Sequence, residues 1–128
     1  MTKKKGWTLD MNAGPIFVQI AQNVRRSLAR GDLSPGKKLA SARELAQALG
    51  VNPNTVVHAY MELEKQGVIE KRRGLGTFVR KDAPVAVMRE EMLHSAATSY
   101  AREIRRLGIP SSEGISVLKE VLDAGETE

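Results

Sequence analysis

Two helix start signals lie close together in the stretch SARELAQALGVNPNTVVHAY, which begins at Ser41. Ser41 and Glu44 match the S-x-x-E capping box that begins a helix, and Gly50 is typical of a helix end. Asn52 is a favoured N-cap, and Pro53 suits the first position of the next helix. Two helices joined by so tight a turn predict a helix-turn-helix.

The second helix of this pair is expected over residues 52–66. Its apolar residues recur at helical spacing and predict a buried stripe, made of Val56, Ala59, Tyr60 and Leu63. The residues that follow, 68–81, read as two short strands around a tip that contains glycine. A hairpin directly after a helix-turn-helix predicts a winged helix.

Further helices are expected on both sides of this motif. An amphipathic helix is predicted for residues 15–30, where Ile16, Ile20, Val24 and Leu28 recur every four residues. After the hairpin, a long helix is predicted for residues 85–107, and a last helix begins at Ser111 or Ser112. The expected fold is therefore mostly α with a small β-hairpin, a winged helix-turn-helix domain followed by a two-helix tail.

The charges divide in nearly the same place as the predicted domains, which are residues 1–81 and 82–128. Residues 1–82 contain fifteen lysines and arginines against seven carboxylates, whereas residues 83–128 contain five against eight. A basic segment joined to an acidic one suggests a module that binds a polyanion and a tail with another role. Solvated surface charge is the alternative explanation.

Several classes of protein are disfavoured by the composition. The chain has no cysteine and only two histidines, so neither a structural metal site nor a cofactor is expected. No nucleophile–base pair or phosphate-binding loop indicates an enzyme. No apolar run is long enough to span a membrane, and the start MTKKKGWTLDM lacks the apolar region of a signal peptide, so we expect a cytoplasmic location.

The first turns of the second helix carry the residues that are expected to contact double-stranded DNA. A helix enters the major groove N-terminus first, so its first two turns meet bases and phosphates. Asn54, Thr55 and His58 are compact and polar and lie off the buried stripe. Asn52 is expected chiefly as the cap and is a further candidate.

Arg43 stands at the start of the preceding helix, where a positive charge opposes the helix dipole. A phosphate or a guanine edge would offset this charge, and arginine can bind either through two parallel hydrogen bonds. A salt bridge to Glu44 or Asp32 is the alternative.

The hairpin is the second expected DNA contact. It carries the basic residues Lys71, Arg72 and Arg73, and Gly74 and Gly76 allow its tip to approach another backbone closely. Such a basic tip can follow phosphates or enter a narrow minor groove.

The tail is expected to form a homodimer. One face of its long helix carries a stripe of mostly apolar side chains, which are Met88, Met92, Ala96, Tyr100 and Ile104. The tail is too short to bury this stripe within one chain. A symmetric partner would cover it. Two copies would place two recognition helices on one face of a duplex, so the expected operator is a pseudo-palindrome.

Residues 14–80 resemble the GntR family of bacterial transcription regulators in three motifs that occur in order. These are PGKKLASARELA, NPNTV and GLGTFV. The NPNTV form and the short tail are similar to the YtrA subfamily, whose two-helix tail dimerises. By position, the resemblance implies DNA contacts from Ser41, Arg43, Asn54, Thr55, His58, Arg73, Gly74 and Thr77.

The sequence departs from the GntR family pattern in two places. Ala40 replaces a usual proline, and Pro53, Val57 and His58 stand where many relatives have basic residues. The bases that this protein reads should therefore differ from those that its relatives read.

Two alternative functions are considered. One is a regulator controlled by a small effector of unknown identity, held between the tails near His94 and Tyr100. The other is a winged-helix module for protein assembly without a DNA role.

Overall fold

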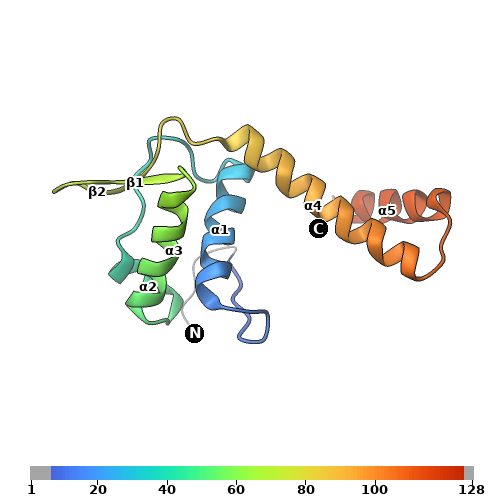
Figure 1. Cartoon of the computed structure of the whole chain (residues 1–128), viewed down its shortest axis with the longest axis horizontal. Coiled ribbons are helices and arrows are strands. Elements are labelled where there is room, and N and C mark those ends of the chain that lie inside the picture. The colour runs from blue at the N-terminus through green and yellow to red at the C-terminus, as the bar shows by residue number, and fades with distance from the viewer. Residues whose placement is uncertain (1–6, 126–128) are drawn as a thin grey trace. The chain divides into compact units, whose positions relative to one another are not determined.

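The structure, a computed structural model, describes residues 7–125 (Figure 1). The basic N-terminal residues on which the signal-peptide expectation rests lie largely outside this range. The elements follow the predicted order: α1 (Ile16–Arg30), α2 (Ala42–Leu49), α3 (Pro53–Lys65), β1 (Ile69–Arg72), β2 (Gly76–Val79), α4 (Val85–Arg106) and α5 (Ser111–Gly125). A mostly helical fold with one small hairpin is thus confirmed, and it is a winged helix-turn-helix.

The tight turn between α2 and α3 forms as its local chemistry predicts. The Ser41 hydroxyl accepts the Glu44 N–H at 3.1 Å, and the Glu44 carboxylate accepts the Ser41 N–H at 2.9 Å, which completes the capping box. Gly50 ends α2 with φ 70°, a left-handed conformation that glycine adopts without strain. The Asn52 side chain then accepts the Asn54 N–H at 2.8 Å and begins α3.

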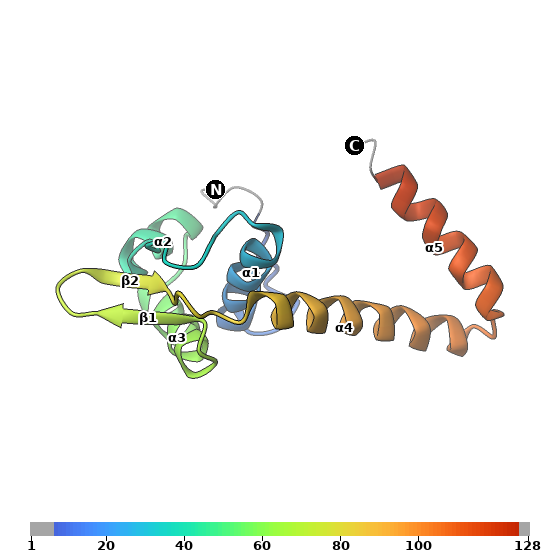
Figure 2. The same cartoon turned by 90° about the horizontal axis from the view of Figure 1, so that it is seen from above.

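The wing, residues 68–81, is an antiparallel hairpin in which Ile69 pairs with Val79 and Lys71 with Thr77 (Figure 2). A third short segment, which the sequence analysis did not anticipate, joins its edge. Lys38 forms an isolated antiparallel bridge with Phe78 in β2. The loop before α2 is therefore attached to the wing by backbone hydrogen bonds.

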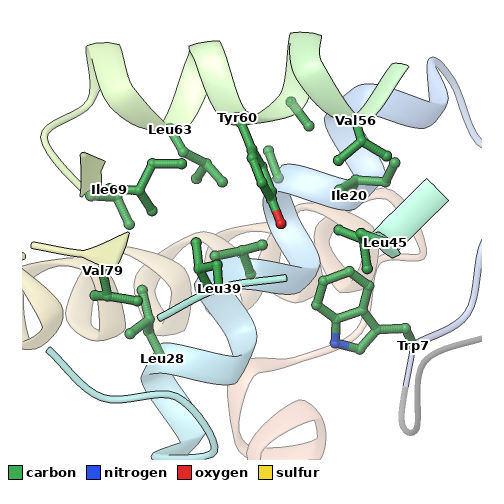
Figure 3. Close-up of a cluster of buried hydrophobic side chains, with 14 of the residues drawn as sticks. Trp7, Ile20, Leu28, Leu39, Leu45, Val56, Tyr60, Leu63, Ile69 and Val79 are labelled. Carbon is green, nitrogen blue, oxygen red and sulfur yellow. The ribbon is translucent and has the colours of Figure 1, made fainter. Parts of the chain in front are cut away.

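One hydrophobic core holds α1, α2, α3 and the wing together. Figure 3 shows side chains from each of these elements meeting in its centre, including Ile20, Leu45, Leu63 and Val79, all of them buried. Trp7 closes the core from the N-terminal segment, and its indole N–H donates to the Ser27 hydroxyl at 3.3 Å. The predicted apolar faces of α1 and α3 meet in this core and supply eight of the seventeen buried hydrophobic residues in the described part of the chain.

Tyr60 connects α3, the expected recognition helix, to the loop before α2 by a hydrogen bond. Its hydroxyl donates to the Ala40 carbonyl at 2.7 Å. Position 40, where the sequence departs from the family's proline, is thus held by a hydrogen bond from α3. Burial, with a smaller contribution from the Glu44 carboxylate, raises the pKa of Tyr60 to about 12.

Tyr60→Phe is expected to lower the free energy of unfolding by about 1–2 kcal/mol at neutral pH, because the Ala40 carbonyl loses its donor. The stability that comes from the raised pKa of Tyr60 is fully present below pH ~10, where the phenol is protonated in both the folded and the unfolded chain. As the pH rises further, the unfolded chain releases that proton first, so stability falls until the pH reaches about 12.

Urea unfolding of both proteins at pH values of about 9 and about 11 tests this expectation, because the wild type should lose more stability over that interval than Tyr60→Phe. Equal losses in the two proteins would show that Tyr60 does not titrate differently on folding.

The chain divides into two compact units, Met1–Arg89 and Glu90–Glu128. The sequence analysis placed the boundary at residues 81 and 82, but the first turn of α4 belongs to the first unit. Met88 is buried in the hydrophobic core there, and Val85 packs against that core one helical turn earlier. The long predicted helix therefore begins inside the winged domain.

The second unit contains the remainder of α4 and all of α5. Figure 2 shows α5 leaving the connecting turn at an angle to α4. The contact between the two helices lies near that turn, where the Tyr100 hydroxyl donates to the Gly114 carbonyl at 2.8 Å and Ile104 covers Gly114. Gly114 is buried under Ile104, whose side chain would have to shift to accommodate a larger residue at position 114.

None of the helices within residues 7–125 combines the length and the apolar character that crossing a bilayer requires.

Candidate nucleic-acid interface

The outward face of α3 presents a continuous row of side chains. Asn54, Val57, His58 and Met61 are exposed, and their spacing of three or four residues places them on one side of the helix. Thr55 lies beside them and is half-buried. The row combines an amide and an imidazole, which can read base edges, with two apolar groups that could contact a thymine methyl.

His58 is held in place by a residue that the sequence analysis did not assign to the interface. Its imidazole stacks on the ring of Phe17 in α1, with 3.7 Å between the centroids and an angle of 9° between the planes. Phe17, Asn52 and Thr55 line the same open depression. The stack leaves one face and the edge of the imidazole for a ligand and restricts its orientation.

Arg43 is exposed in the first turn of α2, and both alternative partners are engaged elsewhere. Glu44 completes the capping box with Ser41, and Asp32 is paired with Arg30 at 3.2 Å. Within residues 7–125 the Arg43 guanidinium makes no hydrogen bond or ion pair. The salt-bridge alternative is therefore not what the structure shows, and the charge remains available to an external anion.

The wing has two faces that differ in their charge. Lys71 and Thr77 point the same way as the buried pair Ile69 and Val79, because side chains alternate along a strand. This inner face turns toward α2 and α3, since Lys71 and Thr77 share a concavity with Val57 of α3. The inner face of the wing and the start of α3 therefore border the same surface.

The outer face of the wing is largely neutralised within the chain. Arg72 contacts the Glu70 carboxylate at 2.9 Å and lies 4.2 Å from the centroid of the Phe78 ring. Arg80 donates two hydrogen bonds to Asp82, which lower the pKa of that carboxyl. By contrast, Lys71 and Arg73 have no partner among the described residues.

The predicted DNA contacts are thus brought together in part. One concavity is lined by Ser41, Lys71, Gly76 and Thr77. A second, open depression is lined by Asn52, Asn54, Thr55 and His58, and Arg43 is exposed in the first turn of α2. Arg73 and Gly74 are exposed at the tip of the wing, and Gly74 has a φ of 76°. Arg72 lies on the opposite face in an internal ion pair, so we leave it out of the contact set.

The residues of the predicted dimerisation stripe differ in their burial. Met88 is buried in the first unit and is not available to a partner. Met92, Tyr100 and Ile104 are half-buried and Ala96 is exposed. More strongly exposed apolar side chains lie elsewhere on the tail, at 61–71% exposure, and these are Leu93, Leu107, Ile115, Val121 and Leu122.

The residues named for a possible effector site have local roles. The Tyr100 hydroxyl is bound to the Gly114 carbonyl, and His94 Nδ1 lies 3.5 Å from the Thr98 hydroxyl one turn along α4. Nor do three or more His, Asp or Glu side chains within residues 7–125 gather where they could hold a metal ion.

A helix-turn-helix with an exposed polar first turn and a basic wing defines a winged-helix nucleic-acid-binding protein. The model for bacterial regulatory proteins of the gntR family matches residues 17–79. The chain is 34% identical over 112 residues to the uncharacterized HTH-type transcriptional regulator YhcF of Bacillus subtilis, covering 87% of this chain and 93% of that protein. It is 44% identical over 78 residues to the HTH-type transcriptional repressor YtrA of Bacillus subtilis, 61% of this chain and 60% of the repressor.

Solved structures agree with these relatives. A GntR family transcriptional regulator from Listeria monocytogenes matches with a TM-score of 0.81 at 29% identity, over 87% of this chain and 98% of that one. AraR(DBD) in complex with operator ORX1 matches with a TM-score of 0.51 at 28% identity, over 62% of this chain and 94% of that one. The chain therefore belongs to the GntR family and is a DNA-binding transcription regulator rather than an enzyme. Its similarity to YtrA supports the predicted YtrA-like subfamily.

Proposed function

We propose that this protein is a homodimeric transcription repressor that occupies a pseudo-palindromic operator in the cytoplasm. The observation that carries the proposal is the concavity that the inner face of the wing shares with Val57 of α3. The exposed polar first turns of α3 and the unpaired Arg43 of α2 add groups that can bind bases and phosphates. A repressor of this kind acts by excluding polymerase and requires no chemistry of its own.

The DNA-binding part is supported by the distribution of side chains over this surface. Asn54 can bind adenine through two hydrogen bonds, Arg43 can bind guanine or phosphate, and the inner face of the wing adds positive charge. AraR, a relative with the same fold, is bound to its operator in its structure. The repressor assignment is supported by the similarity to YtrA, which is named a repressor.

The dimer is supported by the exposed apolar residues of the tail. Ile115, Val121 and Leu122 lie along α5, and all three are more than 60% exposed. Apolar patches of this kind on a small protein mark contacts with a partner. A second copy is the simplest partner, because a two-fold axis pairs identical patches.

Selection from a pool of random duplexes with the purified protein, at about 150 mM salt, tests the proposed function. We expect an enriched inverted repeat whose half-sites lie about 34–36 Å apart, or one helical turn. A single enriched half-site would refute the dimeric mode of binding and preserve DNA recognition. Absence of any enrichment would contradict the proposal and favour a role in protein assembly.

A further inference from the structure

Lys38 is placed by the backbone beside the wing, although no DNA contact was predicted for it. The Leu39 N–H donates to the Thr77 carbonyl at 2.8 Å, and the Val79 N–H donates to the Lys37 carbonyl at 2.8 Å. These bonds hold the segment before α2 along the edge of the wing, where Lys38 forms an isolated bridge with Phe78. The backbone of Lys38 is therefore held in a fixed position relative to the inner face of the wing.

The Lys38 side chain crosses Gly76 at the start of β2. A Cβ atom at position 76 would lie 2.8 Å from the Cε atom of Lys38 and 3.5 Å from its Nζ atom. Any larger residue would push the lysine aside. Gly76 also has a φ of 118°, which favours glycine. Because Gly76 has no side chain, the Lys38 side chain can lie across the wing at this position.

Lys38 lines a concavity of about 240 Å³ together with Lys71 and Thr77 of the wing and with Ser41 and Glu44 at the start of α2. Among residues 7–125, Glu44 is the one acidic residue that lines this concavity, and its carboxylate accepts the Ser41 N–H at 2.9 Å. Two ammonium groups and one carboxylate thus give this lining a net charge of one positive unit, and the hydroxyl groups of Ser41 and Thr77 lie in the same concavity.

We propose that this concavity binds one phosphate of the DNA backbone, with Lys38 and Lys71 supplying the positive charge. The inference rests on the proposed function. A DNA strand that passes from the first turn of α2 to the inner face of the wing must cross this space. Lysine presents a compact charge without the fork that reads a base, so the contact sets the position of the protein on DNA rather than its sequence choice.

Salt titrations of full-length Lys38→Met test the proposal, with Lys37→Met as the matched control. Methionine retains most of the aliphatic chain over Gly76 and removes the charge. Lys37→Met removes the same charge one residue away, where the side chain points to the other side of the strand. Both variants and the wild type are measured on the selected duplex and on a scrambled duplex.

Lys38→Met is expected to reduce the slope of log affinity against log salt by about 0.9 for each protomer that binds, or about 1.8 for the proposed dimer. Between about 50 and about 200 mM salt, the affinity of the variant dimer should then fall about twelvefold less than that of the wild type. The weakening should be equal on both duplexes, and Lys37→Met should retain the wild-type slope.

A wild-type slope in Lys38→Met would overturn the phosphate contact but would not contradict DNA binding through α3 and the wing. The same would follow from a changed sequence preference without a changed slope, which would indicate a base contact. Equal reductions in Lys37→Met and Lys38→Met would show only an effect of total charge, and would also overturn it. A wild-type protein that binds neither duplex at the lowest salt would overturn the proposed function together with this inference.

Discussion

Arg43→Ala is expected to weaken binding to the selected operator by about 1–3 kcal/mol for each half-site, or roughly 5- to 150-fold per half-site, and to relax the sequence preference at one position of each half-site. The physical reason is the free guanidinium in the first turn of α2. Its two acidic neighbours are engaged with other groups, so the charge has no compensation within the described chain. The thermal midpoint should stay unchanged, because the side chain is exposed and makes no internal contact.

Arg43→Lys separates the two ways in which this residue could act. Lysine keeps the charge and loses the fork, so a guanine contact would be lost and a phosphate contact largely retained. Selection with each variant, read together with the salt slope, distinguishes them. Normal affinity and normal specificity in Arg43→Ala would show that Arg43 does not contact the operator.

Val121→Glu is expected to raise the dissociation constant of the dimer at least about a hundredfold, or ~3 kcal/mol. Val121 is 61% exposed on α5, so the folded monomer should accept glutamate there without loss of packing. In a symmetric dimer that covers this face, the same substitution would bury two carboxylates without partners. Light scattering over a range of protein concentrations measures the change.

Val18→Glu is the control for this experiment. It makes the same substitution at another exposed valine, 48% exposed on α1 in the first unit. We expect this variant to remain a dimer. Dimers that persist in Val121→Glu, or equal dissociation of the two variants, would refute the assignment of the α5 face to the partner.

The order and bounds of the elements could be predicted because their signals are local. The capping box at Ser41, the N-cap at Asn52 and the left-handed Gly50 each act over four residues or fewer. These signals fix where each helix begins and ends, whereas packing against the rest of the chain stabilises the helix itself. The internal pairing of Arg72 with Glu70 was also within reach, because residues two apart lie on the same face of a strand.

Other features depended on which faces of distant elements meet. The stack of Phe17 on His58 joins two helices, and Lys38 reaches Gly76 only because a loop aligns with the wing. Periodicity marks an apolar side chain as buried without naming its partner, which is why Met88 was assigned to a dimer contact although it packs in the winged domain. Local chemistry in the sequence therefore specified the helices, the turn and the hairpin, whereas tertiary packing decided which of their charged and apolar side chains stay free for DNA and for a partner.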